Sequence, residues 1–302
     1  MNRKQMKVKS ALQYSIIFLI MSLSQPTKSQ IEFGVFADCQ YCDCETWKDR
    51  FYRNSPAKLS ECVDTFNQNK NIAFVVGLGD LIDRDFSSFD TLQPVLQRLN
   101  TRVYHVIGNH DLEVENIHYE KVPEKLQLSK TWYSFERAGW RFIFLDGNDI
   151  TFHSNNTEVV KQAEQMTGKL KEKNKPNFHE WNGGIGCEQL AWLEEQLRQA
   201  QKQNQQVILF CHYPLLPLEA HTLWNSEEVL AILKKYDGVK CWMNGHNHSG
   251  NYVLWEGIHF LNLKGMVETQ SSNAFAVVKL TSKSIEVKGY GNEPRRRLSL
   301  TK

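Results

Sequence analysis

The sequence predicts an α/β domain in which helices cover buried strands, and two patterns support this prediction. Runs of aliphatic and β-branched residues recur along the chain and each ends in a short polar cluster, which suits strands buried on both faces. Segments with the apolar spacing of helices lie between these runs. The composition, with 41% hydrophobic and 23% charged residues among 302, is that of a globular protein and excludes collagen-like and disordered chains.

Strands and helices alternate through most of the chain. The predicted strands cover residues 31–37, 72–78, 103–107, 207–210 and 239–243. The predicted helices cover residues 56–69, 89–99, 187–203 and 226–235. This order favours a layered arrangement of helices and sheet within one domain.

Two stretches depart from the alternating pattern. Residues 146–186 form the least regular part of the sequence, and a connection of this length is typical of a functional or mobile loop. After His248, short apolar runs are separated by Gly and Ser and predict antiparallel strands. These runs cover residues 252–255, 258–263, 274–280 and 285–287.

The first 29 residues are typical of a secretory signal peptide. They carry five basic side chains and no acidic one, and the basic stretch precedes the apolar residues 11–23. This apolar run is shorter than the roughly 20 residues that a membrane-spanning helix needs. We therefore expect cleavage and a secreted or lumenal location, with residues 30–302 as a single domain. The alternative is an uncleaved signal that anchors the protein in a membrane.

The net charge of the chain, +2, depends on this basic start. The rest of the chain carries 31 basic and 34 acidic side chains, a net charge of about −3. Such a chain is not expected to present a broad basic surface to nucleic acid or to an anionic membrane. Any binding of phosphate therefore requires a local site.

The chain has seven cysteines, and an odd number leaves at least one thiol unpaired within the chain. Cys39, Cys42 and Cys44 resemble half of a zinc site, but no second pair of ligands follows at a suitable spacing. A disulfide among these three and Cys62 is the simpler expectation for an exported protein.

Chemically distinctive side chains follow the predicted strands, at the edge where open α/β sheets place their ligands. In chain order they are Asp38, Gln40, Asp80, Asp83, Asn109, His110, Asp111, His212, His246 and His248. Carboxylate and amide oxygens with imidazole nitrogens, and no thiolate, suit two divalent cations such as manganese, iron or zinc. Two such cations can clamp a phosphoryl group during an in-line displacement. The set therefore predicts metal-assisted hydrolysis of a phosphate ester or anhydride.

The other histidines are interpreted as ordinary hydrogen-bonded residues. They are His105, His118, His153, His179, His221 and His259. An isolated histidine or aspartate is more often structural than functional, whereas the set above forms five clusters that each follow a predicted strand.

Five motifs in this set resemble, in order, those of the calcineurin-like metallophosphoesterases. They are Asp38-x-Gln40, Gly79-Asp80-x-x-Asp83, Gly108-Asn109-His110-Asp111, His212, and Gly245-His246-Asn247-His248. The resemblance implies the family fold, a four-layer α/β/β/α sandwich. This fold agrees with the order of elements above.

The resemblance also implies which residues hold the two metals. One metal would be held by Asp38, Gln40, Asp80 and His248. The other would be held by Asp80, Asn109, His212 and His246, so that Asp80 bridges the two. His110 would not be a ligand but would face the phosphoryl group, stabilising charge or protonating the leaving oxygen. Asp83 and Asp111 would orient the ligands.

Gln40 narrows the resemblance to one branch of the superfamily. Most members have histidine at this position, whereas this chain is similar to the manganese-dependent ADP-ribose/CDP-alcohol diphosphatases. Similar segments extend from residue 31 to 291 and include Trp181-Asn182-Gly183-Gly184. An amide oxygen is a harder ligand than imidazole, so manganese is expected ahead of iron or zinc. Residues 43–51 form a shorter loop than in those relatives, which leaves the preferred base open.

The branch implies a small nucleotide substrate in which a diphosphate joins a nucleoside to a second alcohol, as in ADP-ribose, CDP-choline and other CDP-alcohols. Attack of a metal-bridging hydroxide would give a nucleoside monophosphate and a phosphorylated alcohol. Arg53 is the candidate for binding phosphate, and Asn182 is a second candidate for contact with substrate. Trp47, Trp181 and Trp224 are candidates for stacking on the base, and the alternative for each is a place in the core or as a loop anchor.

Two other functions are compatible with the same motifs. A phosphomonoesterase or a cyclic-nucleotide phosphodiesterase would use the same two metals, and only Gln40 and the branch-like loops argue against it. A non-catalytic scaffold would have lost ligands, whereas all eight predicted ligand and catalytic positions carry competent side chains.

Overall fold

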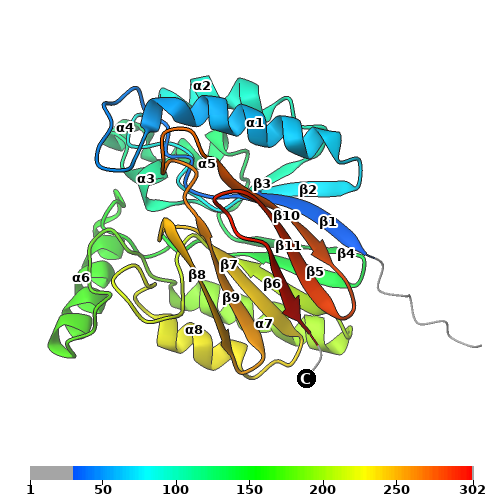
Figure 1. Cartoon of the computed structure of the whole chain (residues 1–302). Helices are drawn as coiled ribbons and strands as arrows, with labels where there is room; N and C mark the ends of the chain where they lie inside the picture. Colours follow the sequence, from blue (N-terminus) through cyan, green and yellow to red (C-terminus); the bar gives the residue numbers. More distant parts are fainter. Residues whose placement is uncertain (1–29, 301–302) are drawn as a thin grey trace, which may run out of the picture.

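Two six-stranded sheets pack face to face in the computed structural model, which describes residues 30–300 (Figure 1). Helices cover the outer face of each sheet, so the predicted four-layer α/β/β/α sandwich is confirmed. The predicted signal peptide lies outside the described residues. Within residues 30–300, every helix is too short or too polar to cross a membrane.

The first sheet has the strand order β12-β11-β10-β1-β2-β3. Its strands are β1 (Ile31–Phe36), β2 (Ile72–Gly77), β3 (Val103–His105), β10 (Ala274–Leu280), β11 (Ser284–Gly291) and β12 (Arg296–Ser299). Strands β1, β2 and β3 run parallel, and β10 joins them antiparallel with Ile31 opposite Leu280. The end of the chain therefore completes the sheet that its beginning starts.

The second sheet has the strand order β4-β5-β6-β7-β9-β8. Its strands are β4 (Tyr133–Arg137), β5 (Trp140–Phe144), β6 (Gln206–Phe210), β7 (Val239–Asn244), β8 (Ser249–Trp255) and β9 (Ile258–Lys264). The prediction of antiparallel strands after His248 holds for β8 against β9 and for β10 against β11. Strand β9 also pairs in parallel with β7, which precedes His248 and was not covered by that prediction.

The four predicted helices are present within a few residues of their expected bounds. Helices α1 (Ser55–Gln68) and α2 (Ser88–Leu96) cover the first sheet, and α7 (Cys187–Lys202) and α8 (Ser226–Leu233) cover the second. Short helical turns precede α1 and follow β3: η1 (Tyr52–Asn54), α3 (Asn109–Leu112), α4 (Asn116–Tyr119) and α5 (Val122–Lys125). The longer elements bury one apolar face against the sheet, which stabilises them.

The stretch from 146 to 186 corrects the prediction of an irregular connection. It contains α6 (Thr157–Glu172), which begins after Asn156, whose side chain accepts a hydrogen bond from the amide of Glu158 at 3.0 Å. Within this helix only Ala163 and Thr167 are buried, while Met166 and Leu170 pack partly buried against the cluster that contains Trp224.

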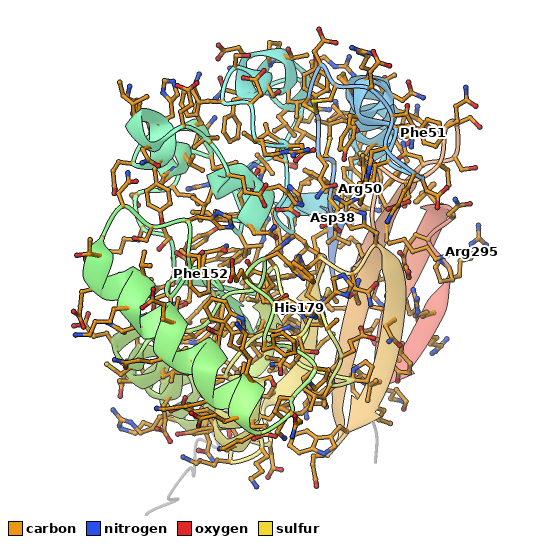
Figure 2. All side chains as sticks on the ribbon, turned by 90° about the vertical axis from the view of Figure 1, so that its left-hand side faces the viewer. Asp38, Arg50, Phe51, Phe152, His179 and Arg295 are labelled. Atoms are coloured by element: carbon orange, nitrogen blue, oxygen red, sulfur yellow. A yellow bond between two sulfur atoms is a disulfide. The ribbon has the colours of Figure 1, made fainter. Side chains whose placement is uncertain are left out.

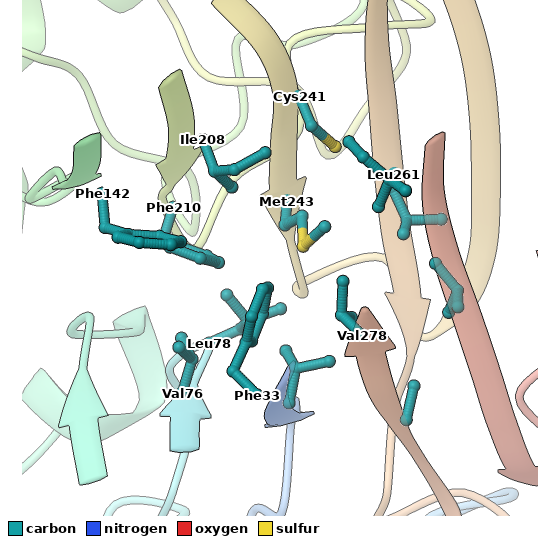
Figure 3. Packing of buried hydrophobic residues seen from close by; sticks show 14 of the residues in the cluster. Phe33, Val76, Leu78, Phe142, Ile208, Phe210, Cys241, Met243, Leu261 and Val278 are labelled. Carbon is teal, nitrogen blue, oxygen red and sulfur yellow. The ribbon is translucent and has the colours of Figure 1, made fainter. Parts of the chain in front are cut away.

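Aromatic residues fill the layer between the sheets (Figure 3). The ring of Phe33 stacks on Phe74 with 5.0 Å between centroids and meets Phe142 and Phe210 edge-on. Replacing the fully buried Phe33 by alanine would cost about 3–5 kcal/mol of stability. This layer fixes the two sheets to each other and with them the strand ends that carry the site.

One disulfide is present among the four cysteines for which a pairing was expected. It joins Cys42 to Cys44, and Cys39 and Cys62 are buried thiols. The bridge closes the start of the loop that leads from Gln40 towards Trp47.

Candidate metal centre and active site

The fold brings the ends of strands from both sheets to one edge of the molecule. Asp38 and Asp80 follow β1 and β2, Asn109 opens α3 after β3, and His212 and His246 follow β6 and β7. Figure 2 faces this edge, with Asp38 near the middle of the view. Residues separated by more than 200 positions therefore meet, as in the hydrogen bond from the His246 amide to Asp38 Oδ1 at 2.9 Å.

Four of the predicted ligand residues have a left-handed backbone. The φ angles are 51° at Asp38, 44° at Gln40, 52° at Asp80 and 67° at His246. Each such residue costs about 1–3 kcal/mol and persists only where its surroundings hold it. Here the amides of Asp38 and Gln40 donate to the carbonyls of Gly79 and Asp80 at 3.2 and 2.8 Å. Backbone strain concentrated in this way is typical of a functional site.

Asp80 lies where two turns approach each other closely. A side chain at Gly108 would place its Cβ 2.0 Å from Asp80 Oδ1, so only glycine fits there. The carboxylate of Asp111 accepts from the backbone amides of Asp80, Leu81, Ile82 and Gly108 at 2.8–3.1 Å. Asp111 therefore lies behind Asp80 and joins the two turns.

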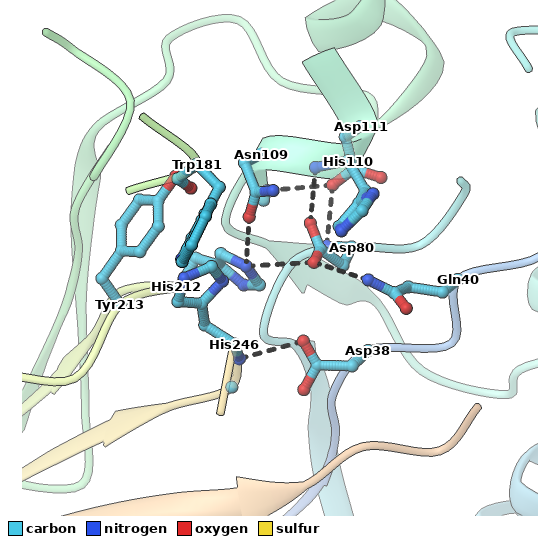
Figure 4. Close-up of polar contacts among 12 residues, drawn as sticks. Asp38, Gln40, Asp80, Asn109, His110, Asp111, Trp181, His212, Tyr213 and His246 are labelled. Atoms are coloured by element: carbon cyan, nitrogen blue, oxygen red, sulfur yellow. Dashed lines mark hydrogen bonds and ion pairs between the residues drawn. The ribbon is translucent and has the colours of Figure 1, made fainter. Parts of the chain in front are cut away.

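The predicted ligands form two groups that share Asp80 (Figure 4). Ligand atoms of Asp80, His212 and His246 lie within 4.8 Å of one another, and the same is true of Asp38, Asp80 and His248. Two amides complete the groups. Asn109 Oδ1 is 3.3 Å from His212 Nε2, and the amide nitrogen of Gln40 donates to Asp80 at 3.1 Å. All seven side chains predicted to hold metal thus converge on one point.

Three buried atoms in this cluster have no hydrogen-bond partner. They are Asp38 Oδ2, Gln40 Oε1 and His248 Nε2. Buried polar atoms are nearly always paired, so each orphan needs an explanation. All three are electron-pair donors on residues predicted to hold the same metal, and they fit a hard divalent cation.

The charges of Asp80 and His212 stabilise each other across 3.2 Å. Burial favours the neutral form of both groups and opposes this effect. Nevertheless, the pKa of Asp80 is held well below its usual range by His212 and His110, and Asp80 raises the pKa of His212 to about 9. Without a cation a proton on His212 therefore balances the carboxylate, and a bound cation would replace that proton.

His110 lies beside this cluster and lines the cavity above it. Its Nδ1 is 2.7 Å from Asp83 Oδ1 and 3.6 Å from Glu113 Oε2. Burial lowers the pKa of His110, but Asp80, Asp83 and Glu113 together raise it above its usual value. A third candidate cation group comprises Asp83, His110 and Glu113, but Arg84 already occupies Asp83 with two hydrogen bonds of 3.1 Å. His110 is therefore better suited to hold a proton than a metal.

A cavity of about 440 Å³ opens over the cluster. It is lined by Gln40, Trp47, Lys48, Arg50, Asp80, Asn109, His110, Glu113, Trp181, His221, His246 and His248. Trp47 and Trp181 stand at its mouth with 53% and 43% of their surface exposed. The ring of His179 stacks on Trp181 at 4.0 Å and supports it from outside the cavity lining. The cavity thus joins a polar floor to an aromatic and basic mouth.

Three of the five substrate-binding candidates lie elsewhere. Arg53 donates to Asp43 and Glu45 at 2.6 Å each and is not part of the cavity wall. Trp224 is only 3% exposed and its Nε1 donates to the carbonyl of His179, so its alternative place in the core is the correct one. Asn182 is fully buried behind His246 rather than in the cavity.

The cavity also contains residues that sequence reasoning missed. Lys48 and Arg50 supply its basic charge, Glu113 brackets His110, and His221 faces the ring of His246 at 5.3 Å. His221 was interpreted as an ordinary structural histidine, and the structure places it in the cavity wall. One aromatic and two basic residues, Trp47, Lys48 and Arg50, occur together in the short loop after the first motif, and this grouping could have indicated a binding site for a nucleotide.

Comparison with known proteins agrees with the motifs. The family model described as calcineurin-like phosphoesterase matches residues 31–250. A manganese-dependent ADP-ribose/CDP-alcohol diphosphatase of Arabidopsis thaliana is 35% identical over 78% of this chain and 86% of its own length. The Homo sapiens protein of the same name is 28% identical over 93% of this chain and 96% of its own length. The crystal structure of a dimetal phosphatase from Danio rerio superposes with a TM-score of 0.80 at 27% identity, covering 90% of this chain and 99% of that one.

Proposed function

The chain belongs to the calcineurin-like phosphoesterase family, and from this premise we propose that it is a dinuclear-metal hydrolase of nucleoside diphosphate derivatives. Its substrates would be ADP-ribose, CDP-choline and other CDP-alcohols. Water would add to one phosphorus while the bond to the bridging oxygen breaks, giving a nucleoside monophosphate and a phosphorylated alcohol. Similarity to proteins named for this activity supports the proposal.

The observation that carries the proposal is the cavity over the two ligand groups. Its floor holds Asp80 at the point common to both groups, and its mouth presents Lys48 and Arg50 together with two exposed tryptophans. Cationic side chains stabilise a diphosphate, and an indole ring stacks on a base. A simple phosphate monoester would need only the floor, whereas a nucleoside diphosphate derivative makes use of the mouth as well.

Manganese is the proposed metal at both positions. The orphaned oxygen atoms of Asp38 and Gln40 are hard donors that suit it, and the relatives are named manganese-dependent. Asp38, Gln40, Asp80 and His248 would hold one ion, and Asp80, Asn109, His212 and His246 the other. Two such ions supply Lewis acidity to the phosphate oxygens and lower the pKa of a bound water.

His110 is proposed as the catalytic acid. It lines the cavity, and the neighbouring carboxylates of Asp80, Asp83 and Glu113 outweigh burial and raise its pKa above the usual value, which favours the protonated ring. That proton would be delivered to the leaving phosphate oxygen as the diphosphate bond breaks. Asp83 would keep the imidazole in place through its 2.7 Å contact with Nδ1.

Product analysis tests the proposal. The full chain with manganese is incubated separately with ADP-ribose, CDP-choline, cyclic AMP and p-nitrophenyl phosphate, and the products are separated by chromatography. We expect AMP and CMP from the first two substrates, and no product from the Asp80→Asn variant. Faster turnover of p-nitrophenyl phosphate or cyclic AMP would favour the alternative phosphoesterases. Full metal occupancy without turnover of any substrate would favour a scaffold.

We also propose that the enzyme acts in a secreted or lumenal location. The support is the basic and then apolar character of the first 29 residues. Protein secreted by its own host is expected to lack these residues, and an intact-mass measurement tests this. A mass that retains them would favour the uncleaved anchor.

A further inference from the structure

The three histidines of the metal centre differ in what holds their outer ring nitrogen. For His212, Nδ1 lies 2.8 Å from the carbonyl oxygen of Leu78. For His246 it is Nε2 that is held, 2.9 Å from Asn182 Oδ1, and for His248 it is Nδ1, 2.7 Å from Glu268 Oε1. The outer ring nitrogen is therefore held by a backbone carbonyl in His212, by a neutral amide in His246 and by a carboxylate in His248.

The amide of Asn182 can have only one orientation. Its Nδ2 donates to the carbonyls of Ala220 and Asn177 at 2.7 and 3.2 Å, and carbonyls cannot donate in return. The atom that faces His246 must then be the oxygen, which accepts. It follows that Nε2 of His246 carries the hydrogen and that the lone pair of Nδ1 is free for a cation at the site that His246 shares with Asp80 and His212.

Glu268 fixes the opposite tautomer in His248. A carboxylate accepts, so Nδ1 of His248 carries the hydrogen and Nε2, a buried orphan, has the free lone pair. The segment that bears Glu268 is itself held firmly. The buried Lys58 donates to the carbonyls of Met266, Glu268 and Thr269 at 2.9, 2.7 and 2.5 Å.

We propose that Asn182 and Glu268 are positioning residues that impose opposite tautomers on His246 and His248, so that the first turns Nδ1 and the second turns Nε2 to the metals. This inference rests on the metal centre of the proposed function and not on its substrate. It also assigns different tasks to the two positions. A neutral amide supports the position of His246, and a carboxylate supports the position of His248, where Gln40 supplies a neutral ligand.

Nitrogen-15 NMR of labelled histidines in the full chain reads the tautomers directly. Spectra are recorded at pH 8 after chelation and again with zinc as a diamagnetic probe, and each signal is assigned through a His→Gln variant. We expect the proton on Nε2 in His246 and on Nδ1 in His248. A proton on Nδ1 of His246, or on Nε2 of His248, would overturn the proposal.

Stepwise manganese affinities provide the second readout. Asn182→Ala and Glu268→Ala are each expected to weaken one of the two bound ions by about 10- to 100-fold and to leave the other unchanged. The conservative variant Glu268→Gln keeps an acceptor oxygen and is expected to retain the wild-type tautomer of His248. Equal weakening of both ions by both alanine variants would contradict separate tasks.

Two matched variants separate positioning from general loss of stability. Asn177→Ala removes a buried amide of the same segment that donates to Leu223 but does not contact a histidine of the centre. Glu293→Ala removes a buried carboxylate that accepts from the Lys264 amide. Both are expected to lower the melting temperature without changing the tautomers. If tautomers and affinities are as expected but no diphosphate is cleaved, the inference stands and the proposed function fails.

Discussion

The floor and the rim of the cavity are held in different ways. The floor consists of the seven predicted metal-binding residues, which are Asp38, Gln40, Asp80, Asn109, His212, His246 and His248. They lie in the turns that follow β1, β2, β6 and β7 or in the first turn of α3, and they are buried except for His248, whose side chain is 8% exposed. The rim consists of Trp47, Lys48, Arg50, Trp181 and His221. These residues lie on connecting loops, and Trp47 and Trp181 are 53% and 43% exposed.

The difference separates the chemistry from the choice of substrate. Hydrogen bonds to the backbone, such as those from the Asp80 turn to Asp111, make the floor rigid before any ligand arrives. The rim side chains project from loops whose backbone is held by its own hydrogen bonds, such as those between Trp47 and Arg50, so these side chains can be exchanged without loss of the fold. Floor variants should therefore change kcat and metal content, and rim variants should change KM.

Loss of Asp80 is expected to have the largest effect, because this carboxylate belongs to both ligand groups. Asp80→Asn should lower kcat by at least about 1,000-fold, since both cations lose a charged ligand. Metal analysis should find less than two ions per chain. Asp85→Asn, a carboxylate in an exposed turn, is the control and should retain both metals. Full metal content in Asp80→Asn would show that the floor does not depend on this residue.

A variant of His110, which lies beside the floor, tests whether catalysis can be lost while metal binding is kept. His110→Gln should lower kcat by about 100- to 1,000-fold, because the proton donor is lost. The metal content should stay at the wild-type value, since the imidazole of His110 contacts Asp83 and Glu113, and the backbone amide that donates to Asp80 is kept in the variant. Loss of one ion in this variant would instead make His110 a ligand.

The pH dependence of metal binding follows from His212. With a pKa of about 9, its ring holds a proton at pH 7 that a cation must displace. The affinity should therefore fall about tenfold for each unit below pH 9, or about a hundredfold between pH 9 and pH 7. The raised pKa also stabilises the cation-free fold below about pH 6.5, and this contribution is lost as the pH rises through 9.

Calorimetry in buffers of different ionisation enthalpy measures the released proton directly. About one proton per chain should be released at pH 7 in the wild type. In His212→Asn, which still offers an oxygen, that proton should be absent. An affinity that is constant between pH 7 and pH 9 would contradict the ion pair between Asp80 and His212.

Sequence patterns predicted the floor because its residues depend on the regular elements. Asp38 and Asp80 follow apolar strands, and the ends of such strands must meet at one edge of a layered fold. Helix α6 was not predicted. Only Ala163 and Thr167 of its residues are buried, and it carries no residue of the floor. The short strand β5 was also missed, although all its residues are buried in the core.

The rim was harder to predict because loop geometry decides which side chain points inwards. Arg50 and Arg53 are three residues apart, and only the observed backbone shows that Arg50 lines the cavity while Arg53 pairs with two acids. Lys48, two residues before Arg50, has a φ of 53°, which no local pattern indicates. Glu268 lies 20 residues from His248, and no sequence spacing predicts that its carboxylate contacts the His248 ring.

Trp181 offers the most selective test of the rim. Trp181→Ala should raise KM for ADP-ribose and CDP-choline by about 5- to 150-fold, since stacking on a base is worth about 1–3 kcal/mol. Its kcat should stay within about twofold and its metal content should not change, because the ring touches the cavity mouth and His179. Steady-state kinetics with both substrates measure the two constants separately.

A second tryptophan gives the control for this variant. Trp255 is partly buried against the core beneath the second sheet, away from the cavity, so Trp255→Ala should lower the melting temperature and leave KM unchanged. A variant Trp181→Phe should recover most of the wild-type KM, because a phenyl ring still stacks. If Trp181→Ala instead lowered kcat and metal content, this rim residue would contribute to metal binding and catalysis. Substrate choice and chemistry would then not be separate.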